Sequence, residues 1–234
     1  MKVAIMQPYF FPYIGYFQLI RNVDTFVIYD NIEYTKKGWI NRNRIFVNGK
    51  AEYITLPLKK ESDYLYVKDR SLAATWDTDK RKMLNKIKEA YRKAPFFSEI
   101  FPIIEDCINY KNQNLFEFIK YTLESINHYV GISTPLIISS SLSFNEELKG
   151  EEKVIAICKA VKATEYINPI GGTELYSKEN FLKEGIKLKF LKVEDFDYNQ
   201  FNYEFIPFLS IIDVLMFNSK EHVMEYLTSK TIIG

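Results

Sequence analysis

The 234-residue sequence is poor in the side chains on which many catalytic centres depend. It contains two histidines, His128 and His222, and two cysteines, Cys107 and Cys158, and neither cysteine is close to a histidine in the sequence. This scarcity argues against a nucleophilic triad and a zinc site, so we expect no metal site. A P-loop and a G-x-G-x-x-G segment are also absent. Any chemistry must therefore come from carboxylates, tyrosines, Arg and Lys side chains or backbone groups.

Long apolar runs and a strong charge of one sign are also missing. No stretch reaches the roughly 18 uninterrupted apolar residues of a membrane-spanning helix. Gln7 and Pro8 interrupt the apolar run at residues 3–6 before it could form the core of a signal peptide. The net charge of +1 gives no reason to expect nucleic acid as a partner. Two cysteines are too few for a disulfide framework, and we expect both to be small core residues of a cytoplasmic protein without a membrane span.

The apolar content of 47% is sufficient for a large core, and the apolar spacing alternates between strand and helix patterns. Short apolar or alternating runs predict strands at residues 2–6, 25–29, 64–67, 136–138, 165–168 and 186–191. Helical spacing is found at residues 14–20, 77–93, 97–110, 114–130, 151–161, 177–184, 208–217 and 221–227. This alternation predicts an α/β protein with an open, mostly parallel sheet.

The sequence predicts two further features beside the sheet and its helices, a β-hairpin and a helical insertion. Residues 44–47 and 52–56 flank Asn48-Gly49, which accepts the positive φ of a type I′ turn, and so predict a β-hairpin near the N-terminus. The three predicted helices between about residues 77 and 130 indicate an inserted helical bundle. No linker or internal repeat stands out, so residues 1–234 are expected to form a single domain.

The N-terminal twenty residues read as a strand, an aromatic loop and a helix. In an open parallel sheet, a ligand binds outside the carboxyl end of a strand, near the free N–H groups of a helix N-terminus. We therefore interpret Gln7, Tyr13 and Tyr16 as site residues, with Gly15 allowing a close approach of the backbone. The alternative is that the aromatic side chains close the end of the core, which is the interpretation we favour for the phenylalanines.

Two carboxylates are candidates for catalysis. Asp30 ends the second predicted strand and would lie at the same sheet edge as Gln7, although a solvated turn is an equal alternative. Asp213 falls in a very apolar helical segment, where an unpaired carboxylate is energetically unfavourable. It must either face water or have a partner, for which an arginine of the basic segment is one candidate.

The segment NIEYTKKGWINRN, residues 31–43, is polar and basic, with one tryptophan. Arginine offers a planar fork that matches phosphate or carboxylate, lysine offers a mobile charge, and tryptophan can stack on a base or sugar. We interpret the segment as a site for a phosphate-bearing small ligand. The alternative is an edge strand that its charges protect from aggregation. The candidate binding residues are Lys36, Trp39, Asn41, Arg42 and Arg44.

Two later turns could also contact a ligand. Ser139 and Ser140 follow one predicted strand, and Gly171 and Gly172 follow another. Serine hydroxyls and backbone N–H groups can hold phosphate oxygens, and glycine lets a backbone approach a ligand closely. We include all four as candidate substrate-binding residues, although the serines are at least as often part of a polar turn and a Gly-Gly pair alone is a weak signal.

Five segments of the chain resemble those of the WbqC-like proteins. They are QPYFFPYIGYFQLI from Gln7, WINRNRI from Trp39, ISSSL from Ile138, YINPIGGTELY from Tyr166 and LSIIDVLMFN from Leu209. The resemblance therefore runs nearly end to end, and it implies a role in bacterial surface-polysaccharide (O-antigen) biosynthesis, where amino sugars are made and decorated. Our leading hypothesis is transfer of an acyl or aminoacyl group, such as glycyl, onto a nucleotide-linked amino sugar.

In this hypothesis each candidate residue has a role. The cationic cluster would hold the pyrophosphate, Trp39 or a tyrosine would stack on a ring, and Asp30 or Asp213 would accept the amine proton, with Tyr16 as a third catalytic candidate. The donor would be a thioester of coenzyme A or of an acyl-carrier protein. The expected partners are thus a nucleotide-linked sugar and, for one choice of donor, an acyl-carrier protein.

Two alternatives remain open. The strand, the loop and the turn from Tyr13 to Tyr16 are shaped like the H-x-G-H turn of nucleotidyltransferases and adenylate-forming ligases, which would make ATP the ligand. Both histidine positions are tyrosine here, which ranks this alternative second. The other alternative is a noncatalytic module that binds a nucleotide sugar or RNA by aromatic stacking and Arg or Lys contacts. The near-neutral charge counts against RNA.

Overall fold

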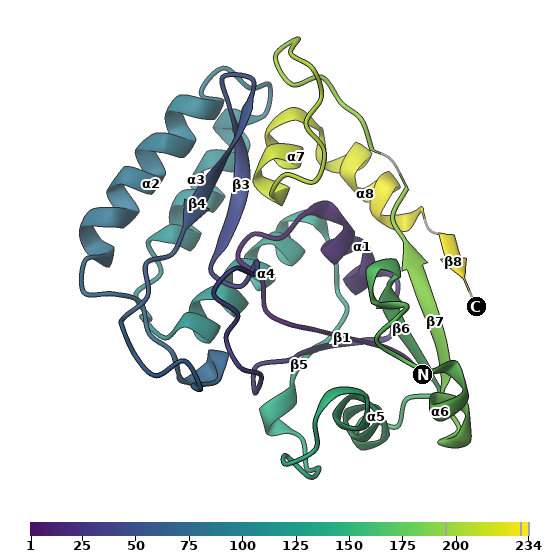
Figure 1. The fold of residues 1–234 in the computed structure, drawn as a ribbon. Helices are drawn as coiled ribbons and strands as arrows, with labels where there is room; N and C mark the ends of the chain where they lie inside the picture. The colour runs from purple at the N-terminus through teal and green to yellow at the C-terminus, as the bar shows by residue number, and fades with distance from the viewer. Residues whose placement is uncertain (195, 230, 234) are drawn as a thin grey trace.

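An open, mostly parallel sheet forms the centre of the protein, as the sequence predicts (Figure 1). The computed structural model describes residues 1–194, 196–229 and 231–233. The strands lie in the order β5-β2-β1-β6-β7-β8, and β5, β2, β1, β6 and β7 run parallel. Their bounds are Lys2–Met6 for β1, Thr25–Ile28 for β2, Leu136–Ile138 for β5, Glu165–Pro169 for β6, Lys187–Lys192 for β7 and Thr231–Ile233 for β8.

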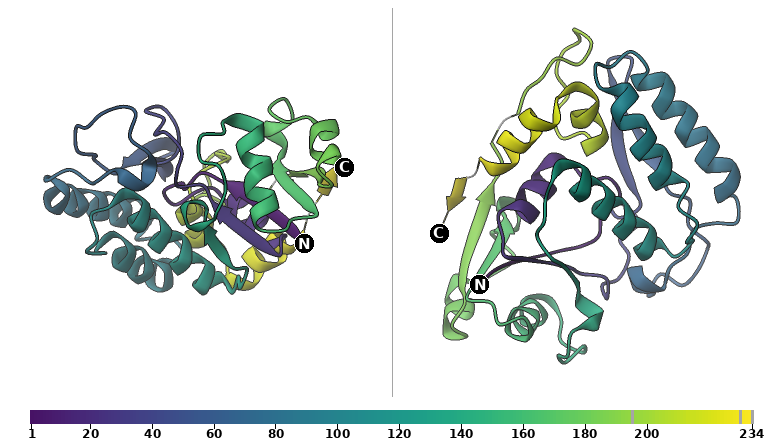
Figure 2. Two further views of the ribbon diagram at one scale, coloured as in Figure 1. Left: turned by 90° about the horizontal axis from the view of Figure 1, so that it is seen from below. Right: turned by 180° about the vertical axis from the view of Figure 1, so that it is seen from behind.

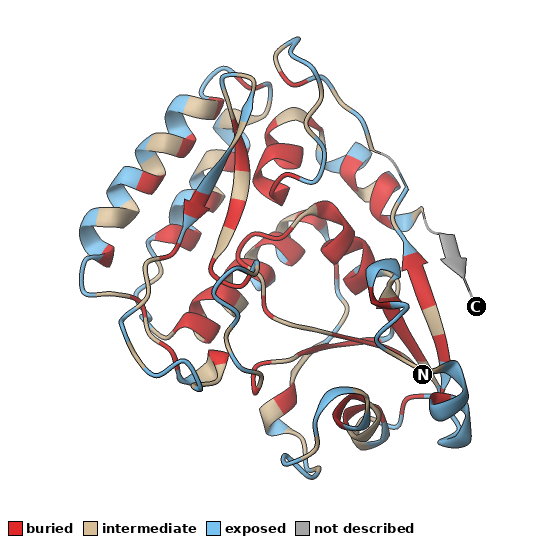
Figure 3. Cartoon of the chain, in the orientation of Figure 1, coloured by how far each residue is buried: buried red, intermediate tan, exposed pale blue. Residues whose placement is uncertain are grey.

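Helices cover both faces of this sheet. The described helices are α1 (Ile14–Arg21), α2 (Trp76–Tyr91), α3 (Phe97–Ile108), α4 (Leu115–Val130), α5 (Gly150–Ala160), α6 (Lys178–Lys183), α7 (Ile211–Phe217) and α8 (Lys220–Thr228). Ala4 of β1 belongs to the larger buried cluster, with residues of α1, α4, α7 and α8, whereas Val3 and Ile5 pack on the other face with residues of α5 and α6. Because both faces are buried there, β1 and β2 are apolar runs, and β1, β2 and β6 are red along most of their length in Figure 3.

The predicted hairpin and helical insertion are both present. β3 (Arg42–Val47) and β4 (Lys50–Thr55) are joined by Asn48 and Gly49, whose φ angles of 49° and 78° match a type I′ turn. The helices α2, α3 and α4 stand together beside the sheet (Figure 2). The insertion belongs to the same buried cluster as α1 and α7, so the apolar core is continuous across it.

Two local expectations were wrong, and one strand was not predicted. The predicted strand at residues 64–67 is replaced by a bend into a short 3₁₀ helix, η1 (Val67–Asp69), with a single β-bridge between Glu33 and Tyr66. The helix expected from residue 208 begins at Ile211, because Ser210 caps it and Phe208 has a positive φ of 56°. β8 had no counterpart in the prediction.

The order of the strands places a switch point between β1 and β6. From β1 the chain moves to β2 and β5 on one side, and then returns to β6 and β7 on the other. Ligands of such sheets bind beyond the carboxyl ends of the strands that flank the switch point. No described helix combines the length and the apolar character that crossing a membrane requires.

Candidate functional site

A pocket of about 210 Å³ opens just beyond the carboxyl end of β1. Three segments that are far apart in the sequence build it: the loop after β1, the segment leading into β3, and the loop before α7. Its walls are mainly aromatic, and it contains one cationic side chain. The lining residues are Tyr9, Pro12, Tyr13, Trp39, Asn43, Arg44 and Phe208.

The backbone of Phe11 is the point at which these three segments meet. The Asn43 amide donates to the Phe11 carbonyl at 2.8 Å, and the Ser210 hydroxyl donates to the same oxygen at 2.8 Å. The N–H of Ile211 donates to the Pro12 carbonyl at 2.9 Å, and the N–H of Ser210 donates to the Arg44 carbonyl at 2.8 Å. These buried bonds fix the pocket walls relative to one another. Phe10 and Phe11 are buried in the core, as predicted.

Arg44 is the cation of the pocket. Its guanidinium lies 5.6 Å from the centre of the Trp39 ring, and its Nη2 lies 3.4 Å from the Phe208 carbonyl. The Nε–H is buried and has no hydrogen-bond partner among the described residues. An unpaired buried donor is unfavourable, and an anionic ligand oxygen could satisfy it.

The other predicted cationic residues have structural partners. Arg42 donates to the carbonyls of Lys37 at 2.7 Å and Gly38 at 3.1 Å, and so holds the loop that carries Trp39. Lys36 is exposed and forms an ion pair with Asp63 at 2.8 Å. The segment that we interpreted as one cationic cluster is thus divided: Arg44 faces the pocket and Arg42 stabilises its rim.

Asn41 is likewise held by its neighbours. Its amide group donates to the Leu56 carbonyl at 2.8 Å and accepts from the Tyr34 hydroxyl at 2.8 Å. The amide nitrogen therefore joins the 31–43 segment to the chain after β4, and the amide oxygen holds Tyr34 of the same segment.

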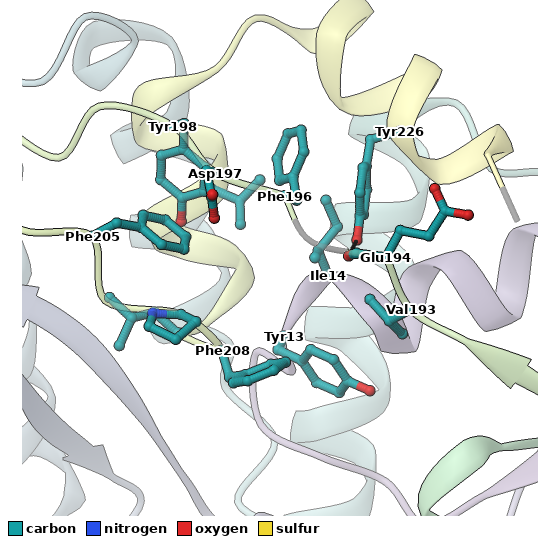
Figure 4. A pocket seen from close by; sticks show the side chains of 13 residues that line it. Tyr13, Ile14, Val193, Glu194, Phe196, Asp197, Tyr198, Phe205, Phe208 and Tyr226 are labelled. Carbon is teal, nitrogen blue, oxygen red and sulfur yellow. Dashed lines mark hydrogen bonds between the residues drawn. The ribbon is translucent and has the colours of Figure 1, made fainter. Parts of the chain in front are cut away.

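Tyr13 and Phe208 form a partition between this pocket and a smaller cavity. Their rings meet edge-on with centres 6.2 Å apart. The smaller cavity, of about 60 Å³, lies behind them among the side chains drawn in Figure 4. Gly15 is needed at this point, because a Cβ there would lie 2.4 Å from the Tyr13 ring. This close approach is made by a side chain of the same chain, and the role of Gly15 in ligand binding stays a prediction.

Tyr16 lies beneath the pocket. It is buried, and its hydroxyl donates to the Gln7 carbonyl at 2.9 Å, which secures the end of β1. Burial raises the pKa of the Tyr16 phenol well above its usual value. The half-buried Gln7 follows β1 at the switch point, two residues before the pocket-lining Tyr9.

Asp213 is fully buried in α7 at the centre of a hydrogen-bond network. Tyr91 donates to its Oδ1 at 2.6 Å, and Tyr198 and Gln200 donate to its Oδ2 at 2.6 and 2.7 Å. Its partners are thus two tyrosines and a glutamine, and the expected arginine is not among them. Burial raises the pKa of the Asp213 carboxyl, although these three hydrogen bonds act in the opposite direction.

Asp30 and the two serines are brought together at the ends of β2 and β5. The Ser139 hydroxyl and the Ser140 N–H donate to Asp30 Oδ1 at 2.7 and 2.9 Å, and the Ser140 hydroxyl donates to Oδ2 at 2.5 Å. Asp30 is 1% exposed, so the alternative of a solvated turn is wrong. Sequence spacing could not show that the candidate carboxylate and the candidate phosphate loop would bind each other.

The two glycines after β6 differ in their surroundings. Gly172 is buried against Asn168, and a Cβ at Gly172 would lie 2.0 Å from the Asn168 side-chain nitrogen. Gly171 is exposed and has open space around it. The group that closely approaches Gly172 is therefore the Asn168 side chain of the same protein, and not a ligand.

The segments that meet around Phe11 are also those that carry the family resemblance. The family model for the WbqC-like protein family matches residues 7–225. This chain belongs to the WbqC-like protein family. It is 30% identical over 228 residues to the uncharacterized protein Rv1507c of Mycobacterium tuberculosis, with 97% of each chain covered. No solved structure matches the chain significantly.

The pocket of this WbqC-like protein includes residues that the sequence did not single out. Tyr9, Asn43 and Phe208 line it together with the predicted Tyr13, Trp39 and Arg44. Asn43 lies within the segment WINRNRI, which is one of the segments that resemble the family. That resemblance was the sequence signal from which Asn43 could have been identified as a pocket residue. Phe208 could not be found in this way, because its place over the pocket depends on the path of the chain before α7.

Proposed function

We propose that the aromatic pocket binds a nucleotide-linked amino sugar, and that the protein transfers an acyl or aminoacyl group onto the sugar amine in bacterial surface-polysaccharide (O-antigen) biosynthesis. The observation that carries the binding step is the Arg44 guanidinium on the wall of an aromatic pocket, with its Nε–H unpaired. Arginine pairs with phosphate oxygens through its planar fork, and Trp39 and the tyrosines offer ring faces to a base or sugar.

The pocket volume supports a partial enclosure of the ligand. Pockets that enclose a whole drug-sized ligand usually measure about 300–1,000 Å³. The pocket of about 210 Å³ would therefore hold one ring, with the pyrophosphate at Arg44 and the remainder of the ligand lying over the rim.

The proposed transfer is an ordinary acyl substitution. The amine lone pair of the sugar attacks the carbonyl carbon of a thioester, a C–N bond forms, and the C–S bond breaks. The thiolate leaves with the bonding electron pair, and the proton lost by the amine passes to a carboxylate and then to the thiolate. The donor is a thioester of coenzyme A or of an acyl-carrier protein.

Two carboxylates are candidates for accepting the amine proton. Asp213 is connected to the neighbouring cavity through Tyr198. The Tyr198 hydroxyl donates a hydrogen bond to Asp213, and Tyr198 lines that cavity. Asp30 is held by Ser139 and Ser140 at the ends of β2 and β5. Asp213 is hydrogen-bonded to Gln200, which holds the loop before the pocket-lining Phe208. We therefore rank Asp213 above Asp30 as the proton acceptor.

Binding is tested by isothermal titration with UDP-, GDP- and dTDP-linked amino sugars, and with ATP as a comparison. We expect Arg44→Gln to weaken binding of the matching nucleotide sugar by about tenfold or more, since a hydrogen bond to a charged group is lost. Arg81→Gln on the exposed face of α2 is the matched control and should bind normally. Equal affinity in the Arg44 and Arg81 variants would contradict this role of the pocket.

Catalysis is tested separately with the bound nucleotide sugar and a thioester donor. Mass spectrometry should show a mass increase on the sugar equal to the transferred group, together with release of one thiol. Saturable binding without product would favour the noncatalytic module, and binding of ATP alone would favour the adenylate-forming alternative.

A further inference from the structure

Lys153 is a buried cation to which the proposed function gives no role. It lies near the start of α5, on the face of the sheet opposite α1, and is 5% exposed. A lysine is rarely buried in this way unless a carboxylate pairs with it. None of the ion pairs found between described residues includes Lys153. The nearby Asp30 carboxylate is already bound by Ser139 and Ser140, so the charge of Lys153 has no direct counterion.

The Lys153 ammonium is enclosed by the backbone and by two aromatic rings. Its Nζ donates to the Asn31 carbonyl at 3.2 Å, and the ring centres of Tyr29 and Tyr66 each lie 5.6 Å from Nζ. An ammonium group has three N–H donors, and the part of the chain that the structure describes supplies no second acceptor. Burial lowers the pKa of Lys153, because it disfavours the charged form, and a bound anion would favour that form again.

This ammonium lies at the edge of the sheet where ligands of such folds bind. Asn31, which accepts its hydrogen bond, comes three residues after the last residue of β2. The N–H of Tyr29 donates to the carbonyl of Met6, the last residue of β1, at 2.7 Å. The N–H of Asp30 donates to the hydroxyl of Ser139, directly after β5, at 3.2 Å. The carboxyl ends of β1, β2 and β5 therefore meet beside the ammonium, which is the place expected for a ligand.

Around Lys153, hydrogen-bond donors outnumber the acceptors available to them. Asn31 is fully buried, and its Nδ2 has no hydrogen-bond partner among the described residues. The hydroxyls of Tyr29 and Tyr66 also make no hydrogen bond to a described residue. Burial, followed by the phenols of Tyr176 and Tyr66, raises the pKa of Tyr29 to about 12, so its hydroxyl keeps its proton at neutral pH. Unpaired donors around a cation suit an oxyanion, which accepts hydrogen bonds and carries the opposite charge.

We propose that Lys153, Asn31, Tyr29 and Tyr66 form a binding site for an oxyanion, the phosphate or carboxylate group of a second ligand. This site shares no residue with the pocket at Arg44, and the inference does not depend on the proposed function. Tyr29 and Tyr66 are half-buried, so the two rings form the cover between the ammonium and solvent. Because the Tyr66 side chain makes no hydrogen bond to a described residue, rotation about its χ1 gives an anion access to the ammonium.

The test is made on the Arg44→Gln protein, so that the cation of the aromatic pocket does not bind the probe. Isothermal titration with pyrophosphate and with malonate, at constant chloride, measures the affinity for a phosphate and for a carboxylate. We expect at least one of the two to bind. Adding Lys153→Met should weaken this binding by about tenfold or more, since a hydrogen bond from a charged group is lost. Lys149→Met, at the exposed residue before α5, is the matched control and should leave the affinity unchanged.

A second variant tests the tyrosine donors. Tyr29→Phe removes one hydroxyl and keeps the ring, and it should weaken binding of the same probe by roughly three- to tenfold. Tyr64→Phe is the matched control, because Tyr64 is 82% exposed and its affinity should be unchanged. Both Lys153→Met and Tyr29→Phe should remain folded in thermal unfolding, since the first keeps the apolar stem and removes a buried charge without a counterion.

The outcomes separate this inference from the proposed function. No binding of either probe, or equal affinity in the Lys153 and Lys149 variants, overturns the oxyanion site and leaves nucleotide-sugar binding at Arg44 as it was. Tighter binding of pyrophosphate identifies the ligand group as a phosphate, and tighter binding of malonate identifies it as a carboxylate; each result supports the site. Nucleotide-sugar binding that Arg44→Gln does not change contradicts the aromatic pocket alone.

Discussion

The hydroxyl of Tyr91 donates to the Asp213 carboxylate at 2.6 Å, which joins the last turn of α2 to the first turn of α7. The same hydroxyl accepts the N–H of Phe46 in β3 at 2.9 Å. One buried phenol thus connects the helical insertion, the hairpin and the helix that follows the pocket. Through Tyr198 and Gln200, Asp213 extends this connection to the loop that carries Phe208.

Removal of that hydroxyl should destabilise the protein. Tyr91→Phe removes the hydrogen bond to Asp213 and the acceptor of the Phe46 N–H in the core, so we expect a loss of about 2 kcal/mol in the free energy of unfolding. Chemical denaturation measures this change. Tyr121→Phe is the matched control, because its hydroxyl also donates to an aspartate, Asp106, at 2.6 Å but at the surface, where water replaces the bond. A similar loss in both variants would show that burial of the network is unimportant.

The pH dependence of stability should report on Asp213. Burial raises the pKa of this carboxyl in the folded state above its unfolded value of about 3.9. A carboxyl with a raised pKa contributes most to stability while it is protonated, and this contribution is lost as the pH rises through the folded-state pKa. The stability of the wild type relative to Asp213→Asn, which cannot ionise, should therefore fall as the pH rises above about 4.

Thermal unfolding of both proteins between acidic and neutral pH measures this difference. An increase in the relative stability of the wild type with pH would mean that the hydrogen bonds from Tyr91, Tyr198 and Gln200 outweigh the cost of burial, so that the carboxylate is ionised in the folded protein.

Arg42 and Arg44 should respond differently to truncation. Arg42→Ala removes the donors to the Lys37 and Gly38 carbonyls, and we expect a loss of about 1 kcal/mol in stability. Arg44→Ala loses one long hydrogen bond to Phe208 and the contact with the Trp39 ring, but it also removes the unpaired buried Nε–H, so its stability should change by less than about 0.5 kcal/mol while ligand binding weakens. Denaturation and titration on the same two variants check this. Equal losses of stability would show that both arginines stabilise the rim of the pocket.

The two thiols should be unreactive in the native protein. Burial raises the pKa of Cys107 and that of Cys158 to about 12, and both side chains are inaccessible. The reactive thiolate is therefore scarce at pH 8, whereas an ordinary cysteine with a pKa of about 8.5 is partly ionised there. A thiol-specific colorimetric reagent should detect both thiols only after denaturation. Rapid labelling of the native chain would show that the helices around Cys107 or Cys158 open readily.

Much of the architecture could be predicted from local sequence. The run at residues 2–6, the Asn48-Gly49 turn and the helical spacing between residues 77 and 130 each specify an element by short-range geometry, and all are present. The errors lie where distant residues decide the outcome. Residues 64–67 have strand-like composition, but the chain turns there into η1, and Phe208 interrupts the helical spacing with a positive φ.

The candidate site could be predicted only in part. Aromatic and cationic residue types marked the two segments that supply Tyr13, Trp39 and Arg44 to the pocket. Nothing in their spacing showed that Arg42 would bond to its own loop, or that Asp30 would be bound by Ser139. Such pairings depend on which strand ends meet in space.

The sequence by itself therefore determined the order of strands and helices, the hairpin turn and the chemical types available for a site, because periodicity and turn preference act over a few residues. The tertiary structure decided which of those side chains are free to meet a ligand. It buried Asp213 among tyrosines, bound Asp30 to serines and left the Arg44 Nε–H unpaired beside Trp39. The first two outcomes are contacts between segments far apart in the chain, and the burial that determines the energy of all three exists only once the fold has formed.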